Sequence, residues 1–192
     1  MNRTHTGRLA QVVAGIVSLL VVSSVVMRVS GAAFTDTTNN AGNQWTSGDV
    51  VLTDDDLGTA MFAVNNMKPL DVATECIEVT YSGSLDAAVT VYGAIAAGDG
   101  LDTFLDLTVR RGTGGSSADC TGFSSTEVVY TGTLAGFVST HSSFGTGAGS
   151  WAPTGGGPDD VATYQFVVTL QDDDGAQGLT TTATFTWEAQ NT

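Results

Sequence analysis

The sequence predicts an all-β protein, an antiparallel β-sandwich of the jelly-roll type preceded by an N-terminal signal helix. Apolar and polar residues alternate with a period of two in many segments from Trp45 onward, which is typical of strands with one buried and one solvated face. Turn-forming residues separate these runs, and no segment shows a convincing helical period. The 192 residues include 24 Gly and only 3 Pro, and 42% are hydrophobic, which is enough for a packed core.

Eight segments carry the strand pattern. The clearest is 161–171, in which every even position is apolar and is expected to face the core. The segment 180–189 repeats the pattern, with Phe185 and Trp187 among its inward residues. The acidic turn 172–175 between these two runs indicates a hairpin loop. The predicted strands are 45–52, 60–64, 72–82, 87–96, 103–111, 126–135, 161–171 and 180–189.

A long Gly- and Ser-rich stretch, 139–160, is predicted to be a loop. Its two aromatic residues, Phe144 and Trp151, are expected to hold it against the sandwich, and partner binding by one of them is the alternative. His141 is expected to be a solvated loop residue.

The N-terminus has the composition of an export signal. Arg3 and Arg8 precede an apolar run, 9–27, and small residues follow up to Ala33. Cleavage after Ala33 would leave Phe34 as the first mature residue. An uncleaved membrane helix over 9–27 is the alternative, because its length approaches the ~20 residues that span a bilayer. The predicted organisation is a signal peptide (1–33), an N-terminal arm (34–44) and a sandwich domain (45–192).

The charge of the chain excludes some partners. The net charge is −14, and after residue 33 only Lys68, Arg110 and Arg111 oppose 20 acidic residues. Nucleic acid is therefore not an expected partner, because phosphate backbones are bound by clustered cations. Contact with a membrane is expected only through the signal segment, if that segment is retained.

The two cysteines, Cys76 and Cys120, predict one disulfide, since an exported protein meets an oxidising environment. Closing the loop between them would stabilise the fold by about 4 kcal/mol in the chain-entropy model. One buried and one exposed thiol is the alternative. A redox-active pair is not expected at this spacing.

Two acidic triplets are candidate cation sites. Their adjacent carboxylates repel one another, and Ca²⁺ would relieve that repulsion by binding several of their oxygens. No EF-hand pattern surrounds them, so the alternative is a pair of solvated turns that blunt the sheet edges. The residues are Asp54, Asp55, Asp56 and Asp172, Asp173, Asp174. No other cofactor is expected.

Enzyme motifs are nearly absent. His5 leaves with the signal, so the mature chain holds one histidine, His141. One imidazole cannot supply the two histidines of an HExxH zinc site, and no GxSxG motif supports a serine nucleophile. A non-catalytic protein is predicted, with no catalytic residues.

An ordered set of short motifs runs through most of the mature chain. It comprises Ala33-Phe34-Thr35-Asp36, then 42–53 (GNQWTSGDVVLT), 66–69 (NMKP), 76–83 (CIEVTYSG) and 184–188 (TFTWE). This set resembles the TasA and camelysin family of exported proteins. The resemblance implies a jelly-roll sandwich, a signal cut by a dedicated peptidase and, for some members, polymerisation into biofilm fibres by N-terminal strand donation. It also carries a metallopeptidase label from camelysin, for which this chain lacks zinc ligands.

The resulting interpretation is a secreted, non-catalytic structural subunit of an extracellular or cell-surface fibre. Residues 34–44 would be the donated arm, with Phe34 as its apolar anchor and Thr35 and Asp36 beside it. The partner would be another copy of the chain, because strand addition satisfies an open sheet edge. The alternatives are a monomeric secreted adhesin that binds a surface or matrix protein through 139–160, and a camelysin-like metallopeptidase.

Overall fold

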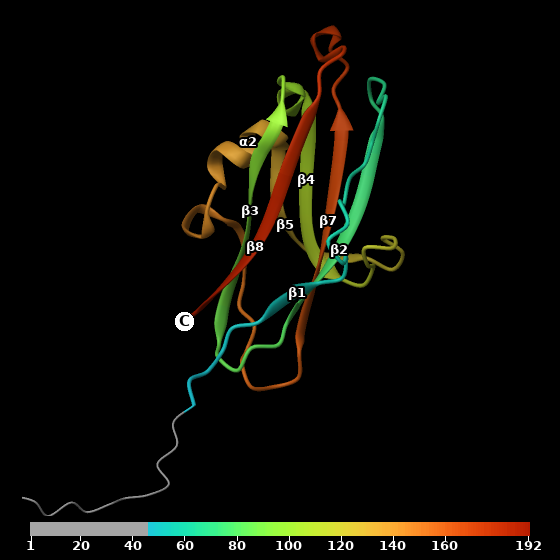
Figure 1. Cartoon of the computed structure of the whole chain (residues 1–192). Helices are drawn as coiled ribbons and strands as arrows, with labels where there is room; N and C mark the ends of the chain where they lie inside the picture. The colour runs from blue at the N-terminus through green and yellow to red at the C-terminus, as the bar shows by residue number, and fades with distance from the viewer. Residues whose placement is uncertain (1–45) are drawn as a thin grey trace, which may run out of the picture. The chain divides into compact units, whose positions relative to one another are not determined.

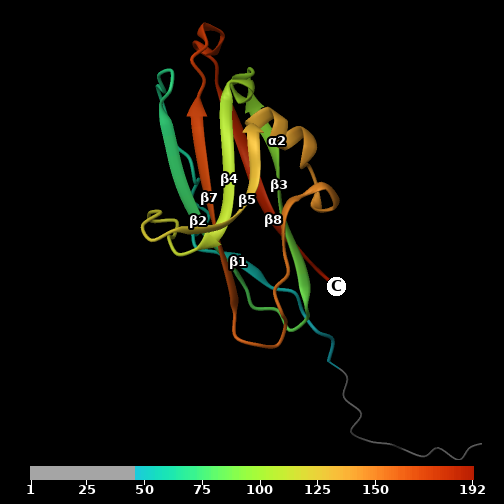
Figure 2. The same cartoon turned by 180° about the vertical axis from the view of Figure 1, so that it is seen from behind.

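The computed structural model describes residues 46–192, which form two antiparallel sheets packed face to face (Figure 1). The larger sheet has the strand order β1-β2-β7-β4-β5, and the smaller has the order β6-β3-β8. Figure 2 shows the larger sheet from its outer side. The prediction of a two-sheet antiparallel sandwich is confirmed.

Along the described chain, most connections between successive strands cross from one sheet to the other. The strands are β1 (Leu52–Asp54), β2 (Val72–Tyr81), β3 (Ala87–Gly98), β4 (Leu105–Thr113), β5 (Ser124–Thr133), β6 (Ala148–Trp151), β7 (Asp160–Leu170) and β8 (Thr181–Asn191). The described residues also form the α-helix α2 (Leu134–Thr140) and the 3-10 helices η1 (Leu101–Thr103), η2 (Phe144–Thr146) and η3 (Asp174–Ala176).

Aromatic contacts between β7 and β8 join the two sheets at the centre of the core. The ring centroids of Phe166 and Phe185 lie 4.7 Å apart, and those of Tyr164 and Trp187 lie 5.5 Å apart. Tyr164 and Phe166 are completely buried. Aromatic pairs at these separations contribute about 0.5–1.5 kcal/mol each beyond the area they bury. The period-two pattern of 161–171 and 180–189 therefore identified the residues that hold the layers together.

Most of the predicted strands are present, and two predictions were wrong. The segment 45–52 shares only Leu52 with β1, because Asp49 is bound to the β2–β3 turn through Ser84. The segment 60–64 is not a strand: its apolar residues contact the core, but its backbone pairs with no described strand.

The predicted hairpin at 172–175 was also wrong. β7 pairs with β2 and β4, whereas β8 pairs with β3 in the other sheet. The turn therefore carries the chain from one sheet to the other. Alternation shows that each strand has one buried face, but it does not show which neighbour the strand pairs with.

The stretch 139–160 is more ordered than predicted, since it contains η2, β6 and the end of α2. The Thr133 side chain caps α2 by accepting a 3.1 Å hydrogen bond from the Gly136 N–H. Trp151 packs against the core, as expected. His141 is not a free loop residue: its N–H donates to the Phe137 carbonyl, and its ring lies 5.1 Å from the Phe137 ring.

The hydroxyl of Tyr164 gives a first prediction, because it is buried without a hydrogen-bond partner among the described residues. Burial raises the pKa of Tyr164 to about 12. The folded protein therefore holds the proton while the unfolded chain releases it near pH 10, so this tyrosine lowers stability as pH rises from 10 to 12. Relative to wild type, Tyr164→Phe should not lose stability at pH 7 and should gain about 1.4 kcal/mol at pH 11, measured by urea unfolding.

The matched control is Tyr81→Phe. Tyr81 is equally buried, but its hydroxyl donates a hydrogen bond to the Leu85 carbonyl. Its loss should cost about 1 kcal/mol at pH 7. Equal destabilisation by the two substitutions would contradict the assignment of an unpaired Tyr164 hydroxyl.

Candidate functional site

The candidate site is the open side of the sandwich, which we define as the space between the free edge of β8 and the inner face of β2. It exists because the five strands of the larger sheet face only three strands of the smaller sheet. β8 packs on β7 through the aromatic pairs described above, so β2 and β1 extend beyond β8 (Figure 1). On this side the smaller sheet thus ends at β8 and covers neither β2 nor β1.

Among residues 46–192, the outer edge of β8 has no strand partner. β8 pairs with β3 from Thr181 to Asn191, and no other described segment hydrogen-bonds to its backbone. In an antiparallel edge strand, the N–H and C=O groups of alternate residues point away from the neighbour and are free to bind another strand. Such an edge is a template for strand addition.

An apolar cavity of about 380 Å³ lies beside this edge. It is placed at the end of the sandwich that carries η1 and the start of β8. At its rim, the Thr181 side-chain oxygen is buried without a hydrogen-bond partner in residues 46–192. The lining comprises Asp56, Thr59, Ala60, Met61, Phe62, Val64, Met67, Ala73, Leu101, Leu105, Leu134, Val168 and Thr181 to Phe185.

One wall of the cavity is an extended segment, 60–67, which we call the strap. Its backbone makes no hydrogen bond with another described residue. Three partly buried side chains, Met61, Phe62 and Met67, pack against the core, and each contributes roughly 1–2 kcal/mol. The other five residues are exposed. Side-chain burial therefore holds the strap in place without the backbone pairing that holds the strands.

Both ends of the strap are fixed by polar contacts. Before it, the Asp55 carboxylate accepts hydrogen bonds from the N–H groups of Glu78 (2.8 Å) and Ser117 (2.7 Å). After it, the Lys68 N–H donates to the Asp71 carboxylate at 2.7 Å, and the Leu70 N–H donates to a β7 carbonyl at 2.8 Å. The strap is suspended between two anchored turns.

The predicted disulfide is present and lies near the first of these anchors. Cys76 in β2 and Cys120 are bonded, with Cα atoms 5.3 Å apart. The bridge ties the 114–123 loop to β2, and Asp55 contacts the same loop through both Ser117 N–H and Ser117 Oγ. A covalent bond and three hydrogen bonds therefore brace this corner of the larger sheet.

The first acidic triplet has structural contacts. Asp55 binds backbone N–H groups, as described, and Asp56 accepts a 2.6 Å hydrogen bond from the Gly58 N–H. Burial, followed by the nearby Asp56 carboxylate, raises the pKa of Asp54. Neighbouring carboxylates disfavour the charged form of each other.

The second triplet caps a turn. Asp173 accepts a 2.7 Å hydrogen bond from the Gly175 N–H at the start of η3, whereas Asp172 and Asp174 are exposed. Within residues 46–192, no group of three or more acidic, histidine or cysteine side chains is arranged so that it could hold a metal ion. Calcium binding by either triplet stays a prediction from sequence.

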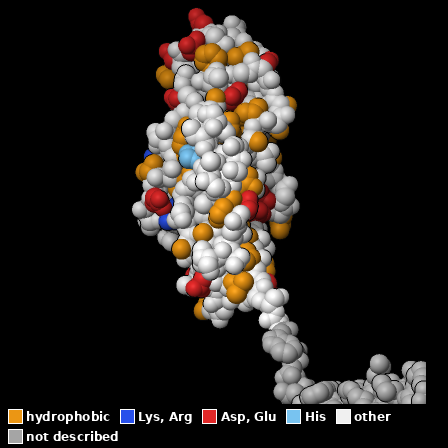
Figure 3. Space-filling view, turned by 90° about the vertical axis from the view of Figure 1, so that its left-hand side faces the viewer, with side chains coloured by type: hydrophobic (Ala, Val, Ile, Leu, Met, Phe, Trp, Pro, Cys, Tyr) orange, Lys and Arg blue, Asp and Glu red, His pale blue; other side chains and the backbone are white. Residues whose placement is uncertain are grey.

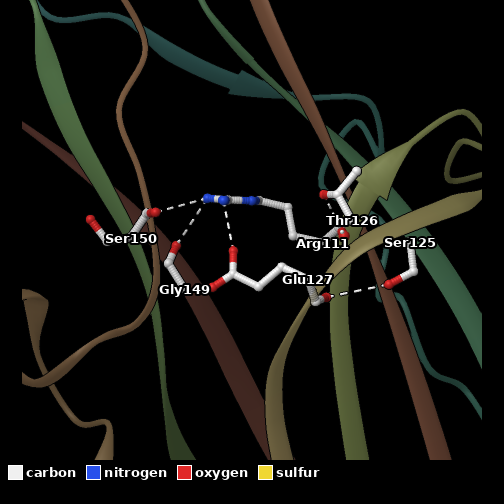
Figure 4. Close-up of polar contacts among 6 residues, drawn as sticks. All are labelled: Arg111, Ser125, Thr126, Glu127, Gly149 and Ser150. Carbon is white, nitrogen blue, oxygen red and sulfur yellow. Dashed lines mark hydrogen bonds and ion pairs between the residues drawn. The ribbon is translucent and has the colours of Figure 1, made fainter.

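The opposite side of the sandwich is closed by Arg111, a residue that the sequence reading missed (Figure 4). Its guanidinium donates a 3.0 Å hydrogen bond to the Ser150 carbonyl in β6 and forms a 2.7 Å ion pair with Glu127 in β5. Arg111 continues the inward phase of Leu105, Leu107 and Val109 in β4. The alternation of β4 could have identified Arg111 from the sequence. It places this arginine on the inner face, where a buried cation needs a polar partner.

The predicted N-terminal features lie outside the described residues. These are the signal peptide and possible membrane helix, the cleavage point between Ala33 and Phe34, and the arm that includes Thr35 and Asp36. In the part of the chain that the structure describes, no helix is long and apolar enough to span a bilayer.

Comparison with known proteins identifies no relative. No protein-family model matches the chain, and no curated protein matches it in sequence.

Arg111 generates the second prediction. Arg111→Met should destabilise the fold by about 1–2 kcal/mol, because it removes a hydrogen bond between the sheets and leaves Glu127 without its cation. Glu127→Gln should cost less than about 1 kcal/mol, since the Glu127 side chain is 41% exposed and the Arg111 side chain keeps its carbonyl partners. Chemical denaturation measures both. A larger cost for Glu127→Gln would show that the ion pair, rather than the contact between sheets, is the stabilising element.

Proposed function

We propose that the protein is a secreted, non-catalytic structural subunit of an extracellular or cell-surface fibre. Copies join head to tail when the arm 34–44 of one adds as a strand to β8 of the next. The observation that carries this proposal is the unpaired β8 edge beside an apolar cavity. An added strand would extend the smaller sheet over β2 and satisfy free backbone groups of β8, and an arm whose first residues pair with Thr181 to Phe185 would place Phe34 in the cavity.

The direction of β8 favours the arm of another copy over the chain's own arm. Asn191 pairs with Ala87, and Asp49 bonds to Ser84 in the adjacent turn, so β8 ends where the described domain begins. An arm that folded back from this end onto its own β8 would run parallel to it. The arm of a copy stacked at the cavity end would run antiparallel. All the strand pairs of residues 46–192 are antiparallel, the arrangement that is slightly more stable per residue.

Head-to-tail strand addition does not close on itself. The arm and the β8 edge are different surfaces, so each copy that joins leaves one free arm and one free edge. Such a contact propagates as a filament unless its rotation closes a ring. The disulfide is typical of proteins that work outside the cytoplasm and supports the proposed secretion.

We include in this proposal that the sandwich is of the jelly-roll type and that the chain is related to the TasA and camelysin family, which it resembles in sequence. In support, among the strands that the structure describes, only β1–β2 and β4–β5 are consecutive strands paired in one sheet, and the other connections cross between sheets. The non-catalytic assignment rests on the sequence, in which the proposed mature chain holds one histidine.

The third prediction tests the arm. A chain that begins at Phe34 should form filaments visible by negative-stain electron microscopy, and Phe34→Asp should abolish them because it places a charge where an apolar anchor is needed. Deletion of 34–44 should have the same effect. The melting temperature of the monomer should be unchanged, because the proposal gives the arm a contact in another copy and none in its own subunit.

Thr35→Ser is the matched control, because it changes the arm without removing the anchor. Filaments formed by Phe34→Asp would overturn the anchor assignment. A wild-type chain that stays monomeric at every concentration in sedimentation experiments would overturn the proposed function and favour a monomeric binding module.

The fourth prediction concerns salt. Acidic side chains far outnumber cationic ones in the chain and on the face shown in Figure 3, so copies repel one another at low ionic strength. Filament growth should accelerate several-fold between about 0.01 M and about 0.15 M NaCl, as the Debye length falls from about 30 Å to about 8 Å. Light scattering follows the growth. A rate that falls with added salt would show that attraction between charges drives assembly.

A further inference from the structure

We infer that the strap is a removable cover. It occupies the open side in the free subunit and leaves it when an extended segment of a second copy pairs with β8. This inference rests on the proposed function and adds a step to it, because the groove must be uncovered before the strand can bind.

The first argument is how the strap is held. A fourth strand beside β8 would lie over β2, where Met61, Phe62 and Val64 now line the cavity together with Ala73 of β2. The strap and an added strand therefore compete for the same space. The strap has no backbone hydrogen bonds to described residues, whereas an added strand would form a ladder with β8. The exchange gives up the contacts of Met61, Phe62 and Met67, gains those of Phe34 and adds backbone pairing.

The second argument is that the strap can leave without unfolding its surroundings. Its flanking turns are fixed independently, by Asp55 on one side and Asp71 on the other. Two non-glycine residues beside or within it, Leu57 and Asn66, have a left-handed backbone with φ of 56°. This conformation is unfavourable for leucine and better tolerated by asparagine, so movement of the strap can relieve strain at Leu57.

The third argument is the identity of the occupant. The cavity is mainly apolar and opens beside a bare strand edge, which fits an extended peptide with an apolar residue near its end. The arm 34–44 carries Phe34 at the end proposed to be free. The antiparallel direction described above assigns that arm to a second copy.

Methionine oxidation offers a direct measurement. Met61 and Met67 are the only methionines after residue 33, and both belong to the strap and are partly buried against the core. Dilute hydrogen peroxide converts an exposed thioether to the sulfoxide, with transfer of one oxygen and release of water. Mass spectrometry of Met61 and Met67 therefore reports whether the strap is seated.

We expect both methionines to oxidise at least five-fold faster in filaments than in the monomeric Phe34→Asp chain, with a short methionine peptide as the standard for full exposure. Filaments whose methionines oxidise no faster would overturn the strap inference and leave the proposed function intact. A wild-type chain that forms no filaments would overturn both.

A pair of strap variants tests the same point without relying on filaments alone. Phe62→Ser removes an anchor that packs on the core, whereas Ala63→Ser changes an exposed strap residue that does not line the cavity. In the Phe34→Asp background, Phe62→Ser should raise Met61 oxidation several-fold and tighten binding of a synthetic peptide of residues 34–45, and Ala63→Ser should do neither. Weaker peptide binding by Phe62→Ser, with the melting temperature confirming a folded chain, would show that the strap is part of the binding surface and not a cover.

Discussion

The unequal width of the two sheets is the constraint on which the rest of the structure depends. Five strands face three, so the smaller sheet covers the inner face of the larger one only as far as β8. The apolar residues of β2 need another cover, and the strap supplies it with side chains alone. On the other side, α2 and the Arg111 contacts to β6 close the gap with buried side chains and hydrogen bonds. Hydrogen bonds therefore link the two sheets on the Arg111 side, whereas on the β8 side the strap covers β2 through side-chain packing alone.

The local pattern of the sequence predicted most strands but not their partners. Alternation in 161–171 and 180–189 identified the core residues, because burial of one face is a local property. The assignment of β7 and β8 to different sheets depends on pairings with distant strands. The same limit explains 60–64, where Met61 and Phe62 pack on the core while the backbone pairs with no described strand. α2 was missed because a helix of 7 residues is too short to show a period.

The candidate site was predictable in part. Two cysteines in a chain expected to be exported predicted the bond between Cys76 and Cys120, since only one pairing exists. Asp55 was recognised as part of an acidic triplet, but its role depends on Glu78 and Ser117, which only the fold brings near. The β8 edge could not be identified, because an edge strand and a central strand of a small sheet share the same alternation.

The bracing of the β2 corner has a mechanical consequence for a fibre of the proposed kind. Tension would reach each subunit through the strand bound to β8 and leave through the segment before Asp49, which is bonded to the opposite end. Hydrogen bonds in an antiparallel ladder lie perpendicular to the strands. A force along β8 would therefore shear all the hydrogen bonds of its ladder together and would not break them one after another. The same pull would draw β1 along β2, where the ladder is only three residues long. The covalent link at Cys76 and the Asp55 contacts lie next to that short ladder, at the point where a stretched filament would otherwise yield first.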